Sequence, residues 1–147
     1  MKENEPIMVQ SVEVVSTKGG TALFLVTKEK TIVIQVDTTI GEALLAAQNG
    51  KQPERPQTHD CMVNLLVGLE AQVSHIVIVD VQDGVFFARI VVKQESVVAK
   101  KIAEIDARPS DALVLALKTK CPIFLNRKVL DACEDMSDTL ARLRKKS

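Results

Sequence analysis

Aromatic residues are scarce in this chain, and neither sign of charge dominates it. Among 147 residues there are four Phe, no Trp and no Tyr, while 19 Lys and Arg balance 19 Asp and Glu. Proteins dedicated to holding single-stranded nucleic acid normally present exposed aromatic rings and a basic surface. The composition therefore argues mildly against such a protein, but it is compatible with an enzyme that contacts nucleic acid briefly.

Cysteine and histidine are too few for several kinds of site. The cysteines, Cys61, Cys121 and Cys133, are widely spaced in apolar segments, so we expect reduced core residues and neither disulfides nor a zinc site. The two histidines, His59 and His75, exclude a His-rich metal cage, and we expect His75 to be structural. The sequence also lacks a P-loop and a Gly-x-Ser-x-Gly nucleophile elbow.

Long hydrophobic runs are missing as well. The longest purely apolar run, residues 112–117, is far too short to cross a bilayer. The first six residues lack the apolar stretch of a signal peptide. We therefore expect a cytoplasmic protein without a membrane-spanning segment.

The distribution of apolar and turn residues predicts an α+β fold. We expect one domain over residues 1–147, with a core at about 7–133, an antiparallel or mixed sheet of β-hairpins, and three or four helices. The clearest hairpin joins the apolar runs 73–81 and 85–92 through Asp83-Gly84, a dipeptide suited to a type I′ turn. Further strands are expected at residues 7–16, 21–27, 31–36, 96–105 and 122–126.

Helical spacing and end signals predict the helices. Thr39 and Glu42 have the spacing of a capping box at the start of the first helix. Thr58 is the expected cap of the second helix, whose buried stripe is predicted at residues 62, 65, 66 and 69. Pro109 opens a central buried helix, residues 128–133 favour a short helix, and residues 137–147 form a basic helical tail.

Two segments concentrate an Arg, a hydroxyl and an Asp where a helix begins. They read Arg-Pro-Gln-Thr-His-Asp at residues 55–60 and Asp-Ala-Arg-Pro-Ser-Asp at residues 106–111. In a structural interpretation, the Asp, Ser and Thr side chains cap helix amides, and Arg55 or Arg108 pairs with a carboxylate of the other segment.

A functional interpretation uses the same side chains. Asp60, Asp106 and Asp111 are candidate ligands for Mg²⁺ or Mn²⁺, because hard cations prefer carboxylate oxygens. The helix N-termini and an Arg would hold a phosphate, and His59 would act as base or ligand. This interpretation requires the two segments to meet in space.

The second segment belongs to a longer motif. Residues 105–116 read Ile-Asp-Ala-Arg-Pro-Ser-Asp-Ala-Leu-Val-Leu-Ala, and Pro-Ile-Phe follows at 122–124. With Arg-Pro at 55–56, Thr-His-Asp at 58–60 and Gly-Val-Phe-Phe-Ala at 84–88, this pattern resembles the bifunctional nuclease domain family over about residues 9–133. The resemblance implies an α+β domain that self-associates as a homo-oligomer and has DNA or RNA as substrate.

The resemblance also suggests which residues carry the function. Candidate catalytic positions are His59, Asp60, Asp106, Arg108, Ser110 and Asp111, and candidate substrate-binding positions are Arg55 and Thr58. One departure concerns a glutamate that family members often carry where the first helix opens, since Ile40 occupies the corresponding position here.

Two hypotheses follow. In the first, the chain is a metal-dependent nuclease that uses Mg²⁺ or Mn²⁺ to cleave phosphodiester bonds. In the second, it is a non-catalytic oligomeric binding module, and the Asp and Arg side chains form a structural ion-pair network. A third, weaker hypothesis is a protein that binds a phosphate ligand at the helix N-termini without chemistry.

Overall fold

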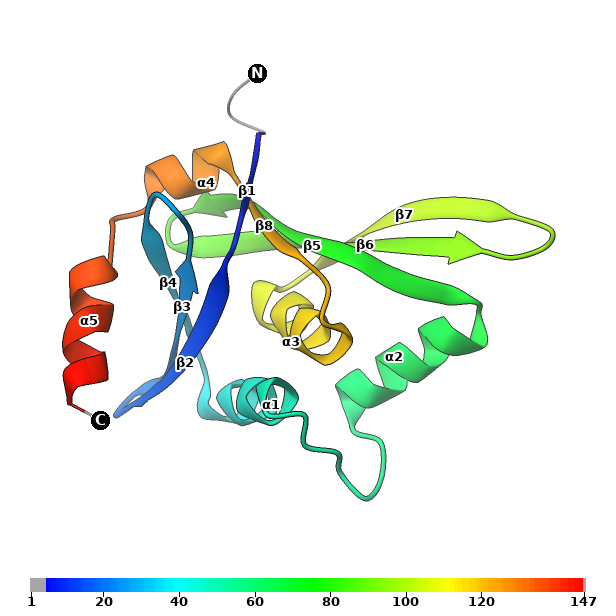
Figure 1. The fold of residues 1–147 in the computed structure, drawn as a ribbon, viewed down its shortest axis with the longest axis horizontal. Helices are drawn as coiled ribbons and strands as arrows, with labels where there is room; N and C mark the ends of the chain where they lie inside the picture. The colour runs from blue at the N-terminus through cyan, green and yellow to red at the C-terminus, as the bar shows by residue number, and fades with distance from the viewer. Residues whose placement is uncertain (1–4, 147) are drawn as a thin grey trace.

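The computed structural model describes residues 5–146, which form eight strands and five helices (Figure 1). The elements in chain order are β1 (Pro6–Met8), β2 (Ser11–Thr17), β3 (Gly20–Val26), β4 (Thr31–Val36), α1 (Thr38–Gln48), α2 (Thr58–Gly68), β5 (Ala71–Gln82), β6 (Val85–Glu95), β7 (Lys100–Ala107), α3 (Pro109–Thr119), β8 (Ile123–Asn126), α4 (Arg127–Ala132) and α5 (Ser137–Lys145).

The strands form two sheets. One is a mixed sheet in the order β1-β8-β5-β6-β7, in which β5 and β8 are parallel and the other neighbours antiparallel. The other is the antiparallel meander β2-β3-β4. The predicted single α+β domain is confirmed. Residues 5–146 contain five helices where three or four were expected, because both the short helix α4 and the tail helix α5 form. No helix among residues 5–146 has the length and apolarity needed to span a membrane.

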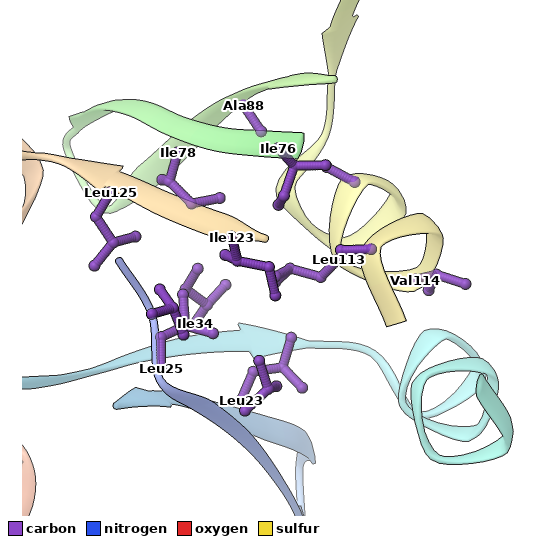
Figure 2. Close-up of a cluster of buried hydrophobic side chains, with 14 of the residues drawn as sticks. Leu23, Leu25, Ile34, Ile76, Ile78, Ala88, Leu113, Val114, Ile123 and Leu125 are labelled. Carbon is purple, nitrogen blue, oxygen red and sulfur yellow. The ribbon is translucent and has the colours of Figure 1, made fainter. Parts of the chain in front are cut away.

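The core lies between the two sheets and around α3. Figure 2 shows Leu113 of α3, Ile76 of β5 and Leu23 of β3 pointing into one apolar cluster. These three side chains are fully buried. Burial of side chains of this size stabilises the fold by roughly 1.5–3 kcal/mol each, so α3 is anchored by apolar packing along most of its length.

Local sequence explains the best-predicted turn and the closest helix approach. Asp83 and Gly84 both have positive φ, 51° and 79°, as a type I′ turn requires. At Gly41, an added Cβ would come within 2.1 Å of the Thr21 hydroxyl oxygen. Glycine therefore allows α1 to lie directly against β3.

Two predicted strands have different boundaries. The strand expected at residues 7–16 is divided, because the Val9 amide donates to Ile123 of one sheet and the Gln10 amide donates to Val26 of the other. The strand expected at 96–105 begins at Lys100, since residues 96–99 form the turn between β6 and β7. Figure 1 shows the resulting β6–β7 hairpin extending beyond the rest of the mixed sheet.

Two helix starts also differ from the prediction. The cap of α1 is Asp37, whose Oδ1 accepts a hydrogen bond of 2.9 Å from the Ile40 amide, and the predicted Thr39–Glu42 capping box is wrong. In α2 the cap is Gln57 rather than Thr58, and the Asp60 carboxylate accepts a hydrogen bond from the Gln57 amide. At the start of α1, the Asp37 carboxylate supplies the acceptor oxygen that was expected from the Thr39 hydroxyl.

The buried stripe predicted for α2 is only partly correct. Met62 and Leu66 pack against the core as expected, and Val63 joins them. Leu65 and Leu69, however, are each 62% exposed. Helix α2 therefore lies over the edge of the core and has no fully buried residue.

Candidate functional site

Two clefts meet at Ile40, near the starts of α1, α2 and α3. The first, here called the His59 cleft, has a volume of about 740 Å³ and is lined by residues of α1, the following loop, α2 and α3. The second, here called the Arg108 cleft, has a volume of about 790 Å³ and lies between the end of β4, the β2–β3 and β5–β6 turns and the start of α3. Ile40 lines both clefts.

A His–Asp pair lies in the His59 cleft. His59 is the second residue of α2, and Asp111 is in the first turn of α3. The Nε2 atom of His59 is 2.9 Å from Oδ1 of Asp111. The imidazole is only 12% exposed and the carboxylate 34%, so the pair is shielded from bulk water on the imidazole side.

A second pair joins the same two helices. The Lys118 ammonium donates to Asp60 at 2.6 Å, and these side chains are 18% and 15% exposed. The hydrogen bond from Lys118 lowers the pKa of Asp60 below its ordinary value, and the Gln57 amide adds to this effect. Asp60 is therefore an ionised partner of a cation that the sequence interpretation missed.

The spacing along α3 relates Lys118 to the predicted residue Asp111. Lys118 follows Asp111 by seven residues, two helical turns, and so lies on the same face of α3. Adjacent residues of α2, His59 and Asp60, thus contact opposite ends of that face. The start of α2 is fixed to α3 at two points.

Asp106 is not part of this group. It lies on β7 directly opposite Arg89 of β6, and Arg89 donates to its carboxylate at 2.6 Å. Asp106 lines neither of the two clefts. The structure therefore brings Asp60 and Asp111 together but leaves Asp106 outside.

The arrangement does not match the metal site expected from the sequence. Asp60 is bonded to Lys118, Asp106 to Arg89 and Asp111 to His59. Across the described part of the chain, no three His, Cys, Asp or Glu side chains are grouped so that they could hold a metal ion. As placed, these side chains do not offer the carboxylate ligands that Mg²⁺ or Mn²⁺ would need.

The Arg108 cleft contains groups suited to an anion. Arg108 is the exposed N-cap residue of α3, and within residues 5–146 its guanidinium has no ion-pair partner. Ser110 lines the same cleft at only 5% exposure, and its hydroxyl has no hydrogen-bond partner in that part of the chain. No side chain caps the first amides of α3. A guanidinium, a hydroxyl and free helix amides together favour a phosphate oxygen.

The two predicted substrate-binding residues are both exposed, but they differ in position. Thr58 lines the His59 cleft. Arg55, in the loop before α2, lines neither cleft. The pairing of Arg55 or Arg108 with a carboxylate of the other segment does not occur among the described residues, because Lys118 and His59 hold these carboxylates instead.

Comparison with known proteins identifies two similar proteins of Mycobacterium tuberculosis. They are the uncharacterized protein MT1877 of strain CDC 1551 / Oshkosh and the uncharacterized protein Rv1829 of strain ATCC 25618 / H37Rv. Each is 29% identical over 102 residues, which cover 69% of this chain and 58% of the relative. The matched region thus spans little more than half the length of these relatives.

A family model covers more of the chain. The model of the bifunctional nuclease domain matches residues 23–137. This range contains all the candidate catalytic residues and the whole of α2 and α3. This match agrees with the motif at residues 105–116. The chain belongs to the bifunctional nuclease domain family.

Proposed function

We propose that this protein is a nuclease that cleaves phosphodiester bonds of DNA or RNA in the His59 cleft. The observation that carries the proposal is the shielded His59–Asp111 pair next to a cleft with an unpaired guanidinium. Membership of the family supports a function related to nucleic acid. The neutral overall charge agrees with transient contact rather than permanent binding.

His59 is the proposed general base. A neutral imidazole that donates its Nε2 proton to Asp111 carries its lone pair on Nδ1. Nδ1 can then accept a proton from a water molecule that attacks phosphorus, while the bond from phosphorus to the leaving sugar oxygen breaks. The imidazolium can afterwards return the proton to that oxygen. The Asp111 carboxylate fixes the ring and stabilises the imidazolium that forms, a contribution of about 10²–10⁴-fold for a well-positioned base.

The Arg108 cleft is the proposed site for a neighbouring phosphate of the strand that is cleaved in the His59 cleft. Arg108 would pair with non-bridging phosphate oxygens, and the Ser110 hydroxyl and the first amides of α3 would donate further hydrogen bonds. Ile40 lies in the wall shared by the two clefts, at the position where family members often carry glutamate. An apolar side chain at this position removes one carboxylate from the wall, although Asp37 still lines the Arg108 cleft and Glu42 the His59 cleft.

Dependence on Mg²⁺ or Mn²⁺ and a cytoplasmic location remain predictions from the sequence. Because the described residues do not supply a three-ligand group, the metal is a variable to be tested. Cleavage in EDTA would agree with the side-chain chemistry described above. Cleavage only with added metal would mean that the substrate helps to bind the ion.

The test is cleavage of labelled single-stranded DNA, duplex DNA and RNA by highly purified protein, in Mg²⁺, Mn²⁺ and EDTA. The chain offers a matched pair of variants in its two histidines. His59→Gln should reduce the rate at least about a hundredfold. His75→Gln should remain close to wild type, because His75 lies on β5 and is bonded to Ser74. Equal rates for wild type and His59→Gln would contradict the proposal.

A second candidate is the non-catalytic binding module. The observation in its favour is that both polar pairs join α2 to α3, so each has a structural use. In that case no substrate is cleaved, and His59→Gln lowers the melting temperature without removing any activity. Parallel melting curves for the variants therefore distinguish the two candidates.

A further inference from the structure

The β6–β7 hairpin exposes an edge that the rest of the molecule leaves open. β7 ends the mixed sheet, and no strand among residues 5–146 pairs with its second side. Ile102 on this strand is 71% exposed, and Val97 and Val98 in the preceding turn are almost completely exposed. An edge of eight residues with free backbone donors and acceptors and exposed apolar side chains is a template for another strand.

We propose that β7 pairs antiparallel with β7 of a second copy of this chain, with Ile102 on the two-fold axis. In this arrangement Ile102 faces Ile102 of the second copy. On each side of the axis, Lys100 faces Glu104 of the second copy. The two mixed sheets become one continuous sheet across the dimer.

Symmetry limits the possible registers. A two-fold axis perpendicular to the sheet keeps the same face of both copies on the same side, so each register is defined by the residue that faces itself. A centre at Lys101 or Glu104 places two like charges directly opposite each other. A centre at Ile105 places Glu104 opposite Asp106, again with like charges, and such pairs are destabilising. Centres nearer the ends of β7 pair fewer residues.

Two positions of the two-fold axis remain, and one of them pairs the facing side chains better. An axis at Ala103 places Ile102 opposite Glu104. Lys100 would then face Asp106, whose carboxylate is already ion-paired with Arg89. A centre at Ile102 places two large apolar side chains together and forms two Lys100–Glu104 pairs. Neither Lys100 nor Glu104 has an ion-pair partner within the described chain, so both are available.

Lysine on an edge strand commonly prevents pairing with other chains. Here the two lysines at the start of β7 are balanced by Glu104 and Asp106 near its end. An antiparallel partner reverses this order and brings opposite charges together. The other edge strand of the same sheet, β1, has only three residues and begins with proline, so it offers a much shorter template.

The experiment measures the mass of the full chain by sedimentation equilibrium over a wide range of concentrations. Wild type should be a dimer that dissociates on dilution. Ile102→Lys should raise the dissociation constant by about a hundredfold, because two charges would meet on the axis. Met8→Lys on β1 is the matched control: Met8 is 54% exposed on the opposite edge, and its replacement should leave the dimer unchanged.

A charge exchange tests the register. Lys100→Glu alone, and Glu104→Lys alone, should each raise the dissociation constant by about tenfold, since each puts like charges opposite each other twice. The double variant Lys100→Glu/Glu104→Lys should restore dimerisation, because both pairs are re-formed with reversed sign. A monomeric wild type, a dimer unaffected by Ile102→Lys, or a double variant that dissociates like the single ones would overturn the proposal.

Discussion

Helices α2 and α3 have the same length, but different forces hold them in place. Each has eleven residues and a run of apolar side chains. In α3, Ser110 and all five residues from Ala112 to Ala116 are buried. In α2 no residue is buried, and Leu65 and Val67, like Leu69 directly after the helix, are each more than 60% exposed.

The difference shows how the site is supported. Apolar burial fixes α3 in the core, whereas α2 has only the partly buried Met62, Val63 and Leu66 against the core and is fastened to α3 by the pairs His59–Asp111 and Asp60–Lys118. The geometry of the His59 cleft therefore depends on polar contacts at the start of α2. Polar substitutions there should alter the site, while apolar substitutions in α3 should alter the whole fold.

The largest effect is expected from a core truncation in α3. Leu113 is fully buried, and Leu113→Ala should lower the free energy of unfolding by about 2–5 kcal/mol through lost burial and the cavity that remains. Leu65→Ala in α2 is the matched variant and should change it by about 0.5 kcal/mol or less. Urea unfolding measures both. Similar losses for the two variants would contradict the contrast between the helices.

A smaller effect is expected from breaking the Asp60–Lys118 pair. Asp60→Ala leaves a partly buried ammonium without its partner and removes a capping acceptor, which should cost about 1–3 kcal/mol. Hydrogen exchange should show faster exchange in α2 and little change in α3. Asp131→Ala breaks an exposed pair with Arg127 at 3.7 Å and should cost well under 1 kcal/mol. Uniform acceleration in both helices after Asp60→Ala would mean that α2 is not held separately.

The smallest effect is a dependence on acid. Because Lys118 lowers the pKa of Asp60 in the folded protein, the stability from this pair is complete above the unfolded pKa of about 3.9 and is lost as pH falls through the lower folded value. The stability difference between wild type and Asp60→Asn should therefore shrink as pH falls from 5 towards 2. Urea titrations at several pH values measure this difference. A difference that stays constant or grows on acidification would show that the carboxylate is not stabilised by Lys118.

The sequence predicted features that local residues determine. Asp83-Gly84 sets its turn through backbone conformation, and the proline and apolar body of α3 are sufficient to identify a buried helix. The stripe of α2 was predicted less well because helical spacing identifies an apolar face but not the extent of the core beneath it. Leu65 and Leu69 lie beyond the edge of the core and are exposed.

The sequence identified only some residues of the candidate site, for a related reason. His59, Asp60 and Asp111 were identified from helix starts that do meet in space. Asp106 was grouped with Asp111 because the two are close in sequence, but it points to the face of the mixed sheet shared with Arg89, opposite the face on which Ala88 and Ile90 pack in the core. Side-chain alternation along β7 separates it from the cleft. Lys118 required knowledge of which helix crosses α3.

The most direct test of the proposed function compares two aspartates of the same motif. Asp111→Asn keeps the shape of the side chain but removes the charge that orients His59. Asp106→Asn makes the same chemical change at a residue that lines neither cleft. Both variants are assayed for nucleic-acid cleavage beside wild type, with melting temperatures measured on the same preparations. The proposed function predicts a loss of about a hundredfold or more for Asp111→Asn and a rate near wild type for Asp106→Asn. Equal activity of the two variants, whether high or low, would contradict it.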